Sequence, residues 1–216
     1  MKSFHPSQIS RLPALLVLIA SIVLYLALPR GLQLGPSYVI PLLEVVLVVV
    51  VALLRPDQQA AHSVHVRTLA IILIALISLA NLASVAFLVN GIISGSGFLS
   101  GRRLVYSAAS IWLTNVFVFG LWFWEMDGGG PARRVSGQST MPDLGFPQTV
   151  TPSLSTPDWR PSMIDYLYVA LTNATAFSPT DTMPLSRLAK SLMSVESLIS
   201  MLTVTIVAAR AINILH

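Results

Sequence analysis

Side chains that carry oxygen gather in a short stretch of the last quarter of the chain. They are hydroxyls, one amide and one carboxylate, at Thr172, Asn173, Thr175, Ser178, Thr180 and Asp181. Oxygen ligands of this kind suit hard cations, and a carboxylate at the mouth of a channel attracts them. The same groups could instead satisfy the backbone of an interrupted helix and cap the helix that follows. Both hypotheses place them where helical structure stops.

The residues around this stretch have the signals of a short helix followed by a break. Ser162 is a candidate N-cap, and Asp165 three residues later completes a pattern close to a capping box. A helix from Met163 to Ala174 would be roughly 18 Å long, too short to cross about 30 Å of hydrocarbon. Pro179 lacks an amide hydrogen and disfavours helix at the residue before it. We therefore expect a short apolar helix, a polar break, and a long apolar helix that restarts near residue 184.

The last apolar segment, residues 184–216, carries one polar stripe. Its members recur every three or four positions, which is the spacing of one helical face: Met193, Glu196, Ser200, Thr203, Val207 and Arg210. Because a charge inside the bilayer is costly, Glu196 should face a cavity or bond a neighbouring helix. With Ser200 and Thr203 it could line an inner path. Arg210 could instead reach the interface from the helix end.

Glu44 is the only ionisable residue inside the first three apolar segments. It could take part in an ion or proton relay together with Glu196. It could equally make a structural hydrogen bond to Ser78 or Asn81, and bonds of that kind between membrane helices contribute about 1 kcal/mol. We expect one of these two roles, because an unpaired carboxylate in the bilayer is unfavourable.

The composition is that of a membrane protein. Hydrophobic residues make up 54% of the chain and charged residues only 10%, whereas soluble domains average about 25% charged. The absence of cysteine excludes disulfides, thiolate metal sites and cysteine catalysis. No histidine lies in an apolar segment to activate a serine, so we expect neither an enzyme nor a metal or cofactor site. The net charge of +4 rests on few residues and indicates membrane topology, not a nucleic-acid partner.

Five apolar segments are candidate membrane spans: Leu12–Leu28, Tyr38–Leu54, Thr68–Ile93, Leu104–Trp124 and Leu185–Leu215. The sequence therefore predicts an all-α, polytopic protein of the cell membrane (inner or plasma). It has five transmembrane helices plus a short re-entrant helix before the last one.

The predicted elements fall into two regions. Residues 1–103 would form an N-terminal three-helix membrane region. Residues 104–216 would form a second module, made in order of an outer helix 104–124, a long loop 125–161, a re-entrant helix and break 162–183, and an inner helix 184–216. The long loop holds three consecutive glycines and six prolines, so we expect it to be irregular and aqueous.

The second module resembles the pore module of potassium-channel-like proteins, in which an outer helix, a pore helix, a filter and an inner helix follow one another. The matching residues are Tyr166-Leu167-Tyr168-Val169-Ala170-Leu171-Thr172, Thr175, Asp181, Pro184-Leu185-Ser186-Arg187-Leu188 and Val207-Ala208-Ala209-Arg210. The whole chain is also similar to a family of uncharacterised bacterial integral membrane proteins. Those have a Trp-rich helix, a Gly-Gly-Gly turn and a break of the type D-Y/F-L-Y…T-A-F-S-P-T-D.

The resemblance implies a homotetramer in the lipid bilayer, with a small monovalent cation passing a central filter-like segment. That segment would consist of Thr172, Thr175, Phe177, Ser178, Pro179, Thr180 and Asp181. Hydroxyl oxygens would come from Thr175, Ser178 and Thr180. Asp181 would set the field at the mouth and Phe177 would form an apolar constriction. Because potassium filters need glycines for their carbonyl ladder and this run has none, we do not expect potassium-type selectivity.

Two other classes of protein fit the same residues. A non-conducting scaffold or accessory subunit would have the break plugged by Phe177 and Pro179 and covered by the loop 125–161. A proton-coupled carrier would use Glu44 and Glu196, close together within one chain. Orientation is also open. Nine of the 13 lysines and arginines fall on the side of the long loop, which places the break in the cytoplasmic half, while channel resemblance places it outside. We prefer the charge argument.

Overall fold

The computed structural model describes residues 12–53, 60–94, 101–151, 153, 156, 159–178 and 181–214. The helices are α1 (Leu12–Ala27), α2 (Val39–Leu53), α3 (Ala60–Ile93), α4 (Gly101–Met126), α5 (Pro131–Ser136), α6 (Pro147–Val150), α7 (Met163–Ala176) and α8 (Arg187–Ile214), with 3-10 turns η1 (Arg30–Leu32) and η2 (Asp127–Gly129). Two short antiparallel strands, β1 (Leu144–Gly145) and β2 (Met183–Pro184), complete the described elements. The prediction of an all-α protein is confirmed.

Three described helices are long and apolar enough to cross a membrane, over Arg67–Ile93, Gly101–Gly129 and Arg187–Ala208. Two more are apolar but shorter, over Leu12–Ala27 and Val39–Val49. The 16 residues of α1 extend about 24 Å, somewhat less than the roughly 30 Å of a hydrocarbon core. The length and composition of the helices are thus compatible with a membrane protein.

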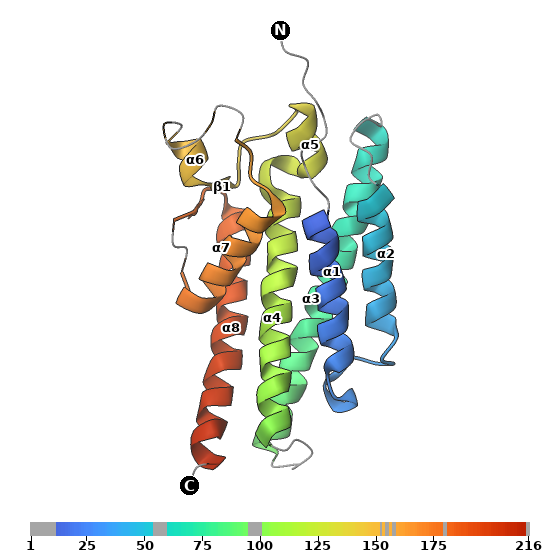
Figure 1. Ribbon diagram of the computed structural model, residues 1–216, viewed down its shortest axis with the longest axis vertical. Helices are drawn as coiled ribbons and strands as arrows, with labels where there is room; N and C mark the ends of the chain where they lie inside the picture. The colour runs from blue at the N-terminus through green and yellow to red at the C-terminus, as the bar shows by residue number, and fades with distance from the viewer. Residues whose placement is uncertain are drawn as a thin grey trace.

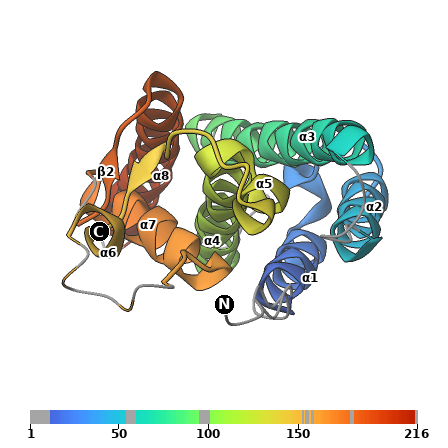
Figure 2. The ribbon, with the colours of Figure 1, turned by 90° about the horizontal axis from the view of Figure 1, so that it is seen from above.

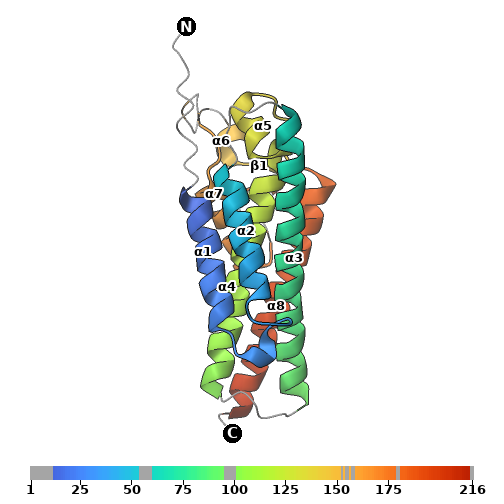
Figure 3. The same cartoon turned by 90° about the vertical axis from the view of Figure 1, so that its right-hand side faces the viewer.

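The long helices lie roughly parallel, with α4 at the centre (Figures 1 and 2). On one side α4 packs against α1 and α3, and on the other against α7 and α8. Figure 3 shows α1 and α2 running alongside α3. The short elements α5, α6 and β1 gather at one end of the bundle, where α4 ends (Figure 1).

The apolar core follows α4 along its length. Toward the end of α4, Phe119 and Phe123 are buried in a cluster that also holds Leu18 of α1 and Tyr166 of α7. Nearer its start, Ile111 belongs to a second cluster, built mainly with residues of α3 and α4. Many large apolar side chains of the outer helices are exposed in the single chain. An outer surface of this kind suits lipid or another protein subunit.

α7 begins with the predicted capping box, in which the Asp165 carboxylate accepts a hydrogen bond from the Ser162 amide at 2.7 Å. The helix runs to Ala176, two residues beyond the predicted end, and stops at Phe177, whose φ of 55° is left-handed. The expected helix restart at Pro184 is wrong. Pro184 lies in β2, and α8 begins three residues later, at Arg187.

The start of α8 is set by Ser186, whose hydroxyl accepts a hydrogen bond from the Ala189 amide at 3.1 Å. A serine in this position is a favoured N-cap, because it satisfies one of the free amides of the first turn. The long loop also has more structure than expected, since α5, β1 and α6 lie within it.

Candidate functional site

The start of α7 is held at the end of α4. The Tyr166 hydroxyl donates a hydrogen bond to Asp127 Oδ2 at 2.7 Å. One residue later Leu167 lies against Gly120, where an added Cβ would stand 2.8 Å from Leu167 Cδ2. The missing side chain at Gly120 therefore lets α7 approach α4 closely.

The other end of α7 lies partway along α8. Asn173 Nδ2 donates to the Met193 carbonyl at 2.9 Å, and the Ser197 hydroxyl donates to the Asn173 carbonyl at 3.4 Å. Met193 and Ser197 lie six and ten residues inside α8, which starts at Arg187. At about 1.5 Å per residue, this end of α7 is thus roughly 9–15 Å from the start of α8. Figure 1 shows α7 beside only the upper half of α4 and α8.

After α7 the chain returns to the end of the bundle at which α7 began. Met183 and Pro184 of β2 pair with Gly145 and Leu144 of β1, and the Leu185 amide donates to the Asp143 carbonyl at 2.8 Å. The amides of Asp143 and Leu144 in turn donate to Asp127 Oδ1, at 2.8 and 3.2 Å. One carboxylate, Asp127, therefore holds both the start of α7 and the strand that pairs with the returning segment.

The residues at the end of α7 and just after it face outward on the single chain. Thr175, Phe177, Ser178 and Asp181 are exposed, while Thr172 is half-buried. The Thr172 and Thr175 hydroxyls donate to carbonyls of their own helix, at Tyr168 and Leu171, both at 2.8 Å. Pro179 and Thr180, also predicted for this segment, lie outside the described residues. The structure thus brings together the described members of the predicted filter-like segment.

A polar cluster lies behind α7, inside the chain. Glu196 of α8 is fully buried, with 0% exposure, and its Oε2 accepts a hydrogen bond from Asn173 Nδ2 at 2.7 Å. From α4, Asn115 Nδ2 donates to the Glu196 carbonyl at 3.3 Å and to Ser200 Oγ at 3.0 Å. Thr203, the next residue of the predicted stripe, is also buried, and its hydroxyl donates to the Ile199 carbonyl at 2.8 Å. The stripe from Met193 to Thr203 therefore faces the interior of the bundle, while the side chain of Arg210 lies outside the described residues.

Asn115 was not among the predicted site residues. Its signal in the sequence is an amide in the middle of an otherwise apolar segment, Leu104–Trp124. Such residues in membrane helices face protein partners, since lipid offers them no hydrogen bond. The sequence alone could have flagged Asn115, but it could not identify Glu196 and Ser200 as its partners.

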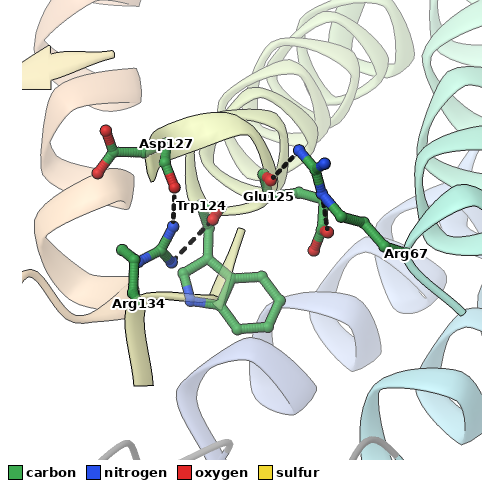
Figure 4. Close-up of polar contacts among 5 residues, drawn as sticks. All are labelled: Arg67, Trp124, Glu125, Asp127 and Arg134. Carbon is green, nitrogen blue, oxygen red and sulfur yellow. Dashed lines mark hydrogen bonds and ion pairs between the residues drawn. The ribbon is translucent and has the colours of Figure 1, made fainter. Parts of the chain in front are cut away.

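The turn after α4 is built on four charged residues and one backbone carbonyl, that of Trp124, which Figure 4 shows together: Arg67, Trp124, Glu125, Asp127 and Arg134. Arg67 Nε lies 3.4 Å from Glu125 Oε1, and Arg67 Nη2 donates to the Glu125 carbonyl at 3.3 Å. Arg134 donates to the carbonyls of Trp124 and Asp127. The two arginines therefore bind backbone carbonyls at the end of α4, where a helix leaves carbonyls without intrahelical partners, and in η2, where the Asp127 carbonyl also accepts the Gly130 amide at 3.0 Å.

Arg134 also stacks on α7. Its guanidinium carbon lies 5.2 Å from the centroid of the Tyr166 ring, within cation–π range. Burial raises the pKa of the Tyr166 phenol, more strongly than the Arg134 charge lowers it. The phenol is therefore a hydrogen-bond donor to Asp127 at neutral pH. The tight turn between these groups uses Gly128, Gly129 and Gly130, all with positive φ.

Glu44 belongs to a different part of the chain. It is fully buried, and its Oε1 accepts a hydrogen bond from the Ser21 hydroxyl of α1 at 2.9 Å. The predicted alternative partner Ser78 instead accepts a hydrogen bond from Trp122 Nε1 at 2.9 Å. α2, which carries Glu44, and α8, which carries Glu196, lie on opposite sides of α4 (Figure 2).

Comparisons with family models, curated proteins and solved structures gave no match to this chain. The class of the protein therefore rests on its own features. Over its described residues it is a helical protein with three helices of membrane-spanning length and composition. A short helix, α7, packs against two of them, α4 and α8.

Proposed function

We propose that this protein is a pore-loop protein of the cell membrane, and that a small monovalent cation passes the segment 172–181. In this proposal α1, α2, α3, α4 and α8 span the bilayer, and α7 with the returning segment 177–186 is the re-entrant element. The proposal rests on the path of the chain through α7. This helix starts beside Asp127, and its other end lies roughly 9–15 Å along α8. The chain that follows returns to the strand pair at the end where α7 began.

The exposure of the turn supports an oligomer. If the end of α7 lies inside a membrane, the non-helical backbone that follows it is tolerated only where protein or a water-filled cavity surrounds it. Thr175, Ser178 and Asp181 are exposed on the single chain, next to apolar side chains such as Leu171 and Phe177. A homotetramer, as in the proteins that the module resembles, would turn these residues toward a shared axis and enclose them.

The chemistry of the turn supports weak selectivity. Phe177 occupies the left-handed conformation that glycine adopts without steric cost. The Thr172 and Thr175 hydroxyls already donate within their own helix, so each offers only lone pairs to a passing ion. Asp181 is exposed and supplies negative charge at the entrance. Cations are therefore attracted by charge, without the carbonyl ladder of a potassium filter.

Cation flux into liposomes tests the proposal. Wild type should conduct small monovalent cations, Asp181→Asn should lower the rate severalfold, and Phe177→Ala should raise it by widening the constriction. Asp143→Asn is the matched control, because it removes a carboxylate at the same end of the bundle but from the loop. If the wild type conducts and neither variant at the turn changes the rate, the path lies elsewhere. Wild-type liposomes that pass no cation would overturn the proposal.

One observation favours a second candidate, a non-conducting scaffold. The segment after the break is fixed to the long loop through the β1–β2 pair and the bond from Leu185 to Asp143, which is a contact that a scaffold with the loop packed beside the break would make. A scaffold predicts no flux, and a monomer or dimer when the protein is weighed in nanodiscs. A conducting tetramer excludes it.

A further inference from the structure

The carboxyl group of Glu196 is enclosed by three helices. Few groups near it could balance its negative charge if it were ionised. The one hydrogen bond that its side chain receives from the described residues comes from a neutral amide, Asn173 Nδ2. Its other oxygen, Oε1, is buried and has no hydrogen-bond partner among the described residues. An ionised carboxylate offers about four acceptor sites, and burying one without a cation or several donors costs several kcal/mol.

The groups that surround Glu196 are neutral. α4 contributes Asn115 and α7 contributes Asn173, while α3 packs on this part of α8 through apolar residues around Leu88. The charged residues of these elements lie farther off. Arg67 of α3 pairs with Glu125 at the end of α4. Arg187 and Lys190 of α8, Arg102 and Arg103 of α4 and Asp165 of α7 are near the starts of their helices, and Arg210 is 14 residues beyond Glu196 along α8.

Asn115 supplies the complementary observation. Its Nδ2 is used twice, on the Glu196 carbonyl and on Ser200 Oγ, but its Oδ1 is buried without a partner among the described residues. Two unpartnered acceptors, Glu196 Oε1 and Asn115 Oδ1, thus occur within one polar cluster. A proton on Glu196 removes the charge and converts Oε1 into a donor that an acceptor such as Asn115 Oδ1 can use.

We infer that Glu196 is a buried proton-binding site between α4, α7 and α8, occupied when α7 is docked. Asn173 connects this site to the segment that precedes the break, because the same amide bonds Glu196 Oε2 and the Met193 carbonyl. Loss of the proton would leave a buried charge at the α7–α8 contact and weaken the docking of α7. The site does not depend on conduction.

Infrared difference spectra in nanodiscs test this assignment. The spectrum of the wild type minus Glu196→Gln should contain the C=O band of a protonated carboxyl group at neutral pH. Asn173→Ala should shift that band, because the donor to Oε2 is removed. Glu44→Gln is the matched control, a second buried glutamate whose removal should leave the Glu196 band in place. No protonated-carboxyl band assigned to Glu196 would overturn the inference.

Thermal unfolding adds an independent readout. Glutamine imitates a protonated glutamate, so the melting temperature of Glu196→Gln should lie within about 2 °C of the wild type at about pH 4 and below, where the unfolded wild type also holds the proton, and above the wild type at neutral pH. The wild type should lose stability as pH rises above about 5, since the folded state holds a proton that the unfolded state releases, and Glu196→Gln should lack this slope.

The alternative occupant, Na⁺, gives the opposite pattern. Stabilisation of the wild type by NaCl over choline chloride, abolished in Glu196→Gln, would show a metal cation at the site and overturn the inference. If Glu196→Gln does not fold, the difference spectrum of Asn173→Ala against wild type still shows whether Glu196 is protonated or ionised. A shifted protonated-carboxyl band supports the proton site, and a change confined to carboxylate bands refutes it.

Discussion

Removing one hydroxyl, by Tyr166→Phe, tests how α7 is held in place. The Tyr166 phenol is fully buried and donates to Asp127 Oδ2 at 2.7 Å. The same Asp127 carboxylate accepts the amides of Asp143 and Leu144 through its other oxygen. Phenylalanine keeps the ring, its packing in the core and its stacking with Arg134, so the substitution isolates the hydrogen bond.

The expected loss of stability in Tyr166→Phe follows from the charge of the acceptor, Asp127. A hydrogen bond to a charged group contributes about 1.5–3 kcal/mol, and here the loss also leaves Asp127 Oδ2 without this donor. For a chain of this size each kcal/mol lowers the melting temperature by about 2–4 °C, so we expect a decrease of about 3–12 °C. Unfolding in nanodiscs, followed by tryptophan fluorescence, measures it.

Tyr168→Phe is the matched control, because that tyrosine lies two residues away in α7 and is 48% exposed. Its melting temperature should stay within about 1 °C of the wild type, since surface substitutions rarely exceed about 0.5 kcal/mol. A Tyr166→Phe protein as stable as this control would refute the argument that Asp127 anchors α7. A double-mutant cycle with Asp127→Asn should show coupling between the two side chains.

Three further predictions concern the same end of the bundle. Gly120→Val should lower stability by about 1–3 kcal/mol through overpacking against Leu167, measured as a lower melting temperature, because even an added Cβ stands 2.8 Å from Leu167 Cδ2. Arg67→Met should destabilise the protein, because the buried Glu125 loses its ion pair. Arg67→Lys should destabilise it less, because a cation remains beside Glu125. Equal melting temperatures of the two variants would contradict this. Burial raises the pKa of Tyr166, so the folded state retains a proton that the unfolded state loses, and stability should decline as pH rises above about 10, with a shallower decline in Tyr166→Phe.

Local features of α7 could be predicted from the sequence, and features that depend on distant residues could not. The Ser162–Asp165 capping box lies within four residues and was predicted correctly. The start of α8 was placed too early at Pro184, which suits the first turn of a helix. Pro184 instead lies in a strand that pairs with Leu144, a residue 40 positions earlier in the chain.

In the candidate site, too, local features could be predicted from the sequence and contacts between distant residues could not. Periodicity correctly placed Glu196, Ser200 and Thr203 on one face of a helix, and all three are buried. It could not show that this face meets Asn115 and Asn173, because periodicity does not name the opposing helix. Asp127 was missed altogether. Its role depends on a loop that folds back to it, and nothing in its own neighbourhood signals that contact.

The bond between Asn173 and Glu196, 23 residues apart, also sets an order of assembly. During synthesis α7 emerges before α8, and until Glu196 and Met193 follow, the Asn173 amide lacks both of its acceptors. A nascent chain that ends before α8 therefore keeps the α4 contacts of α7 at Asp127 and Gly120 but lacks the α8 contacts of Asn173. A truncated product without α8 should accordingly hold α7 less firmly than the full chain does.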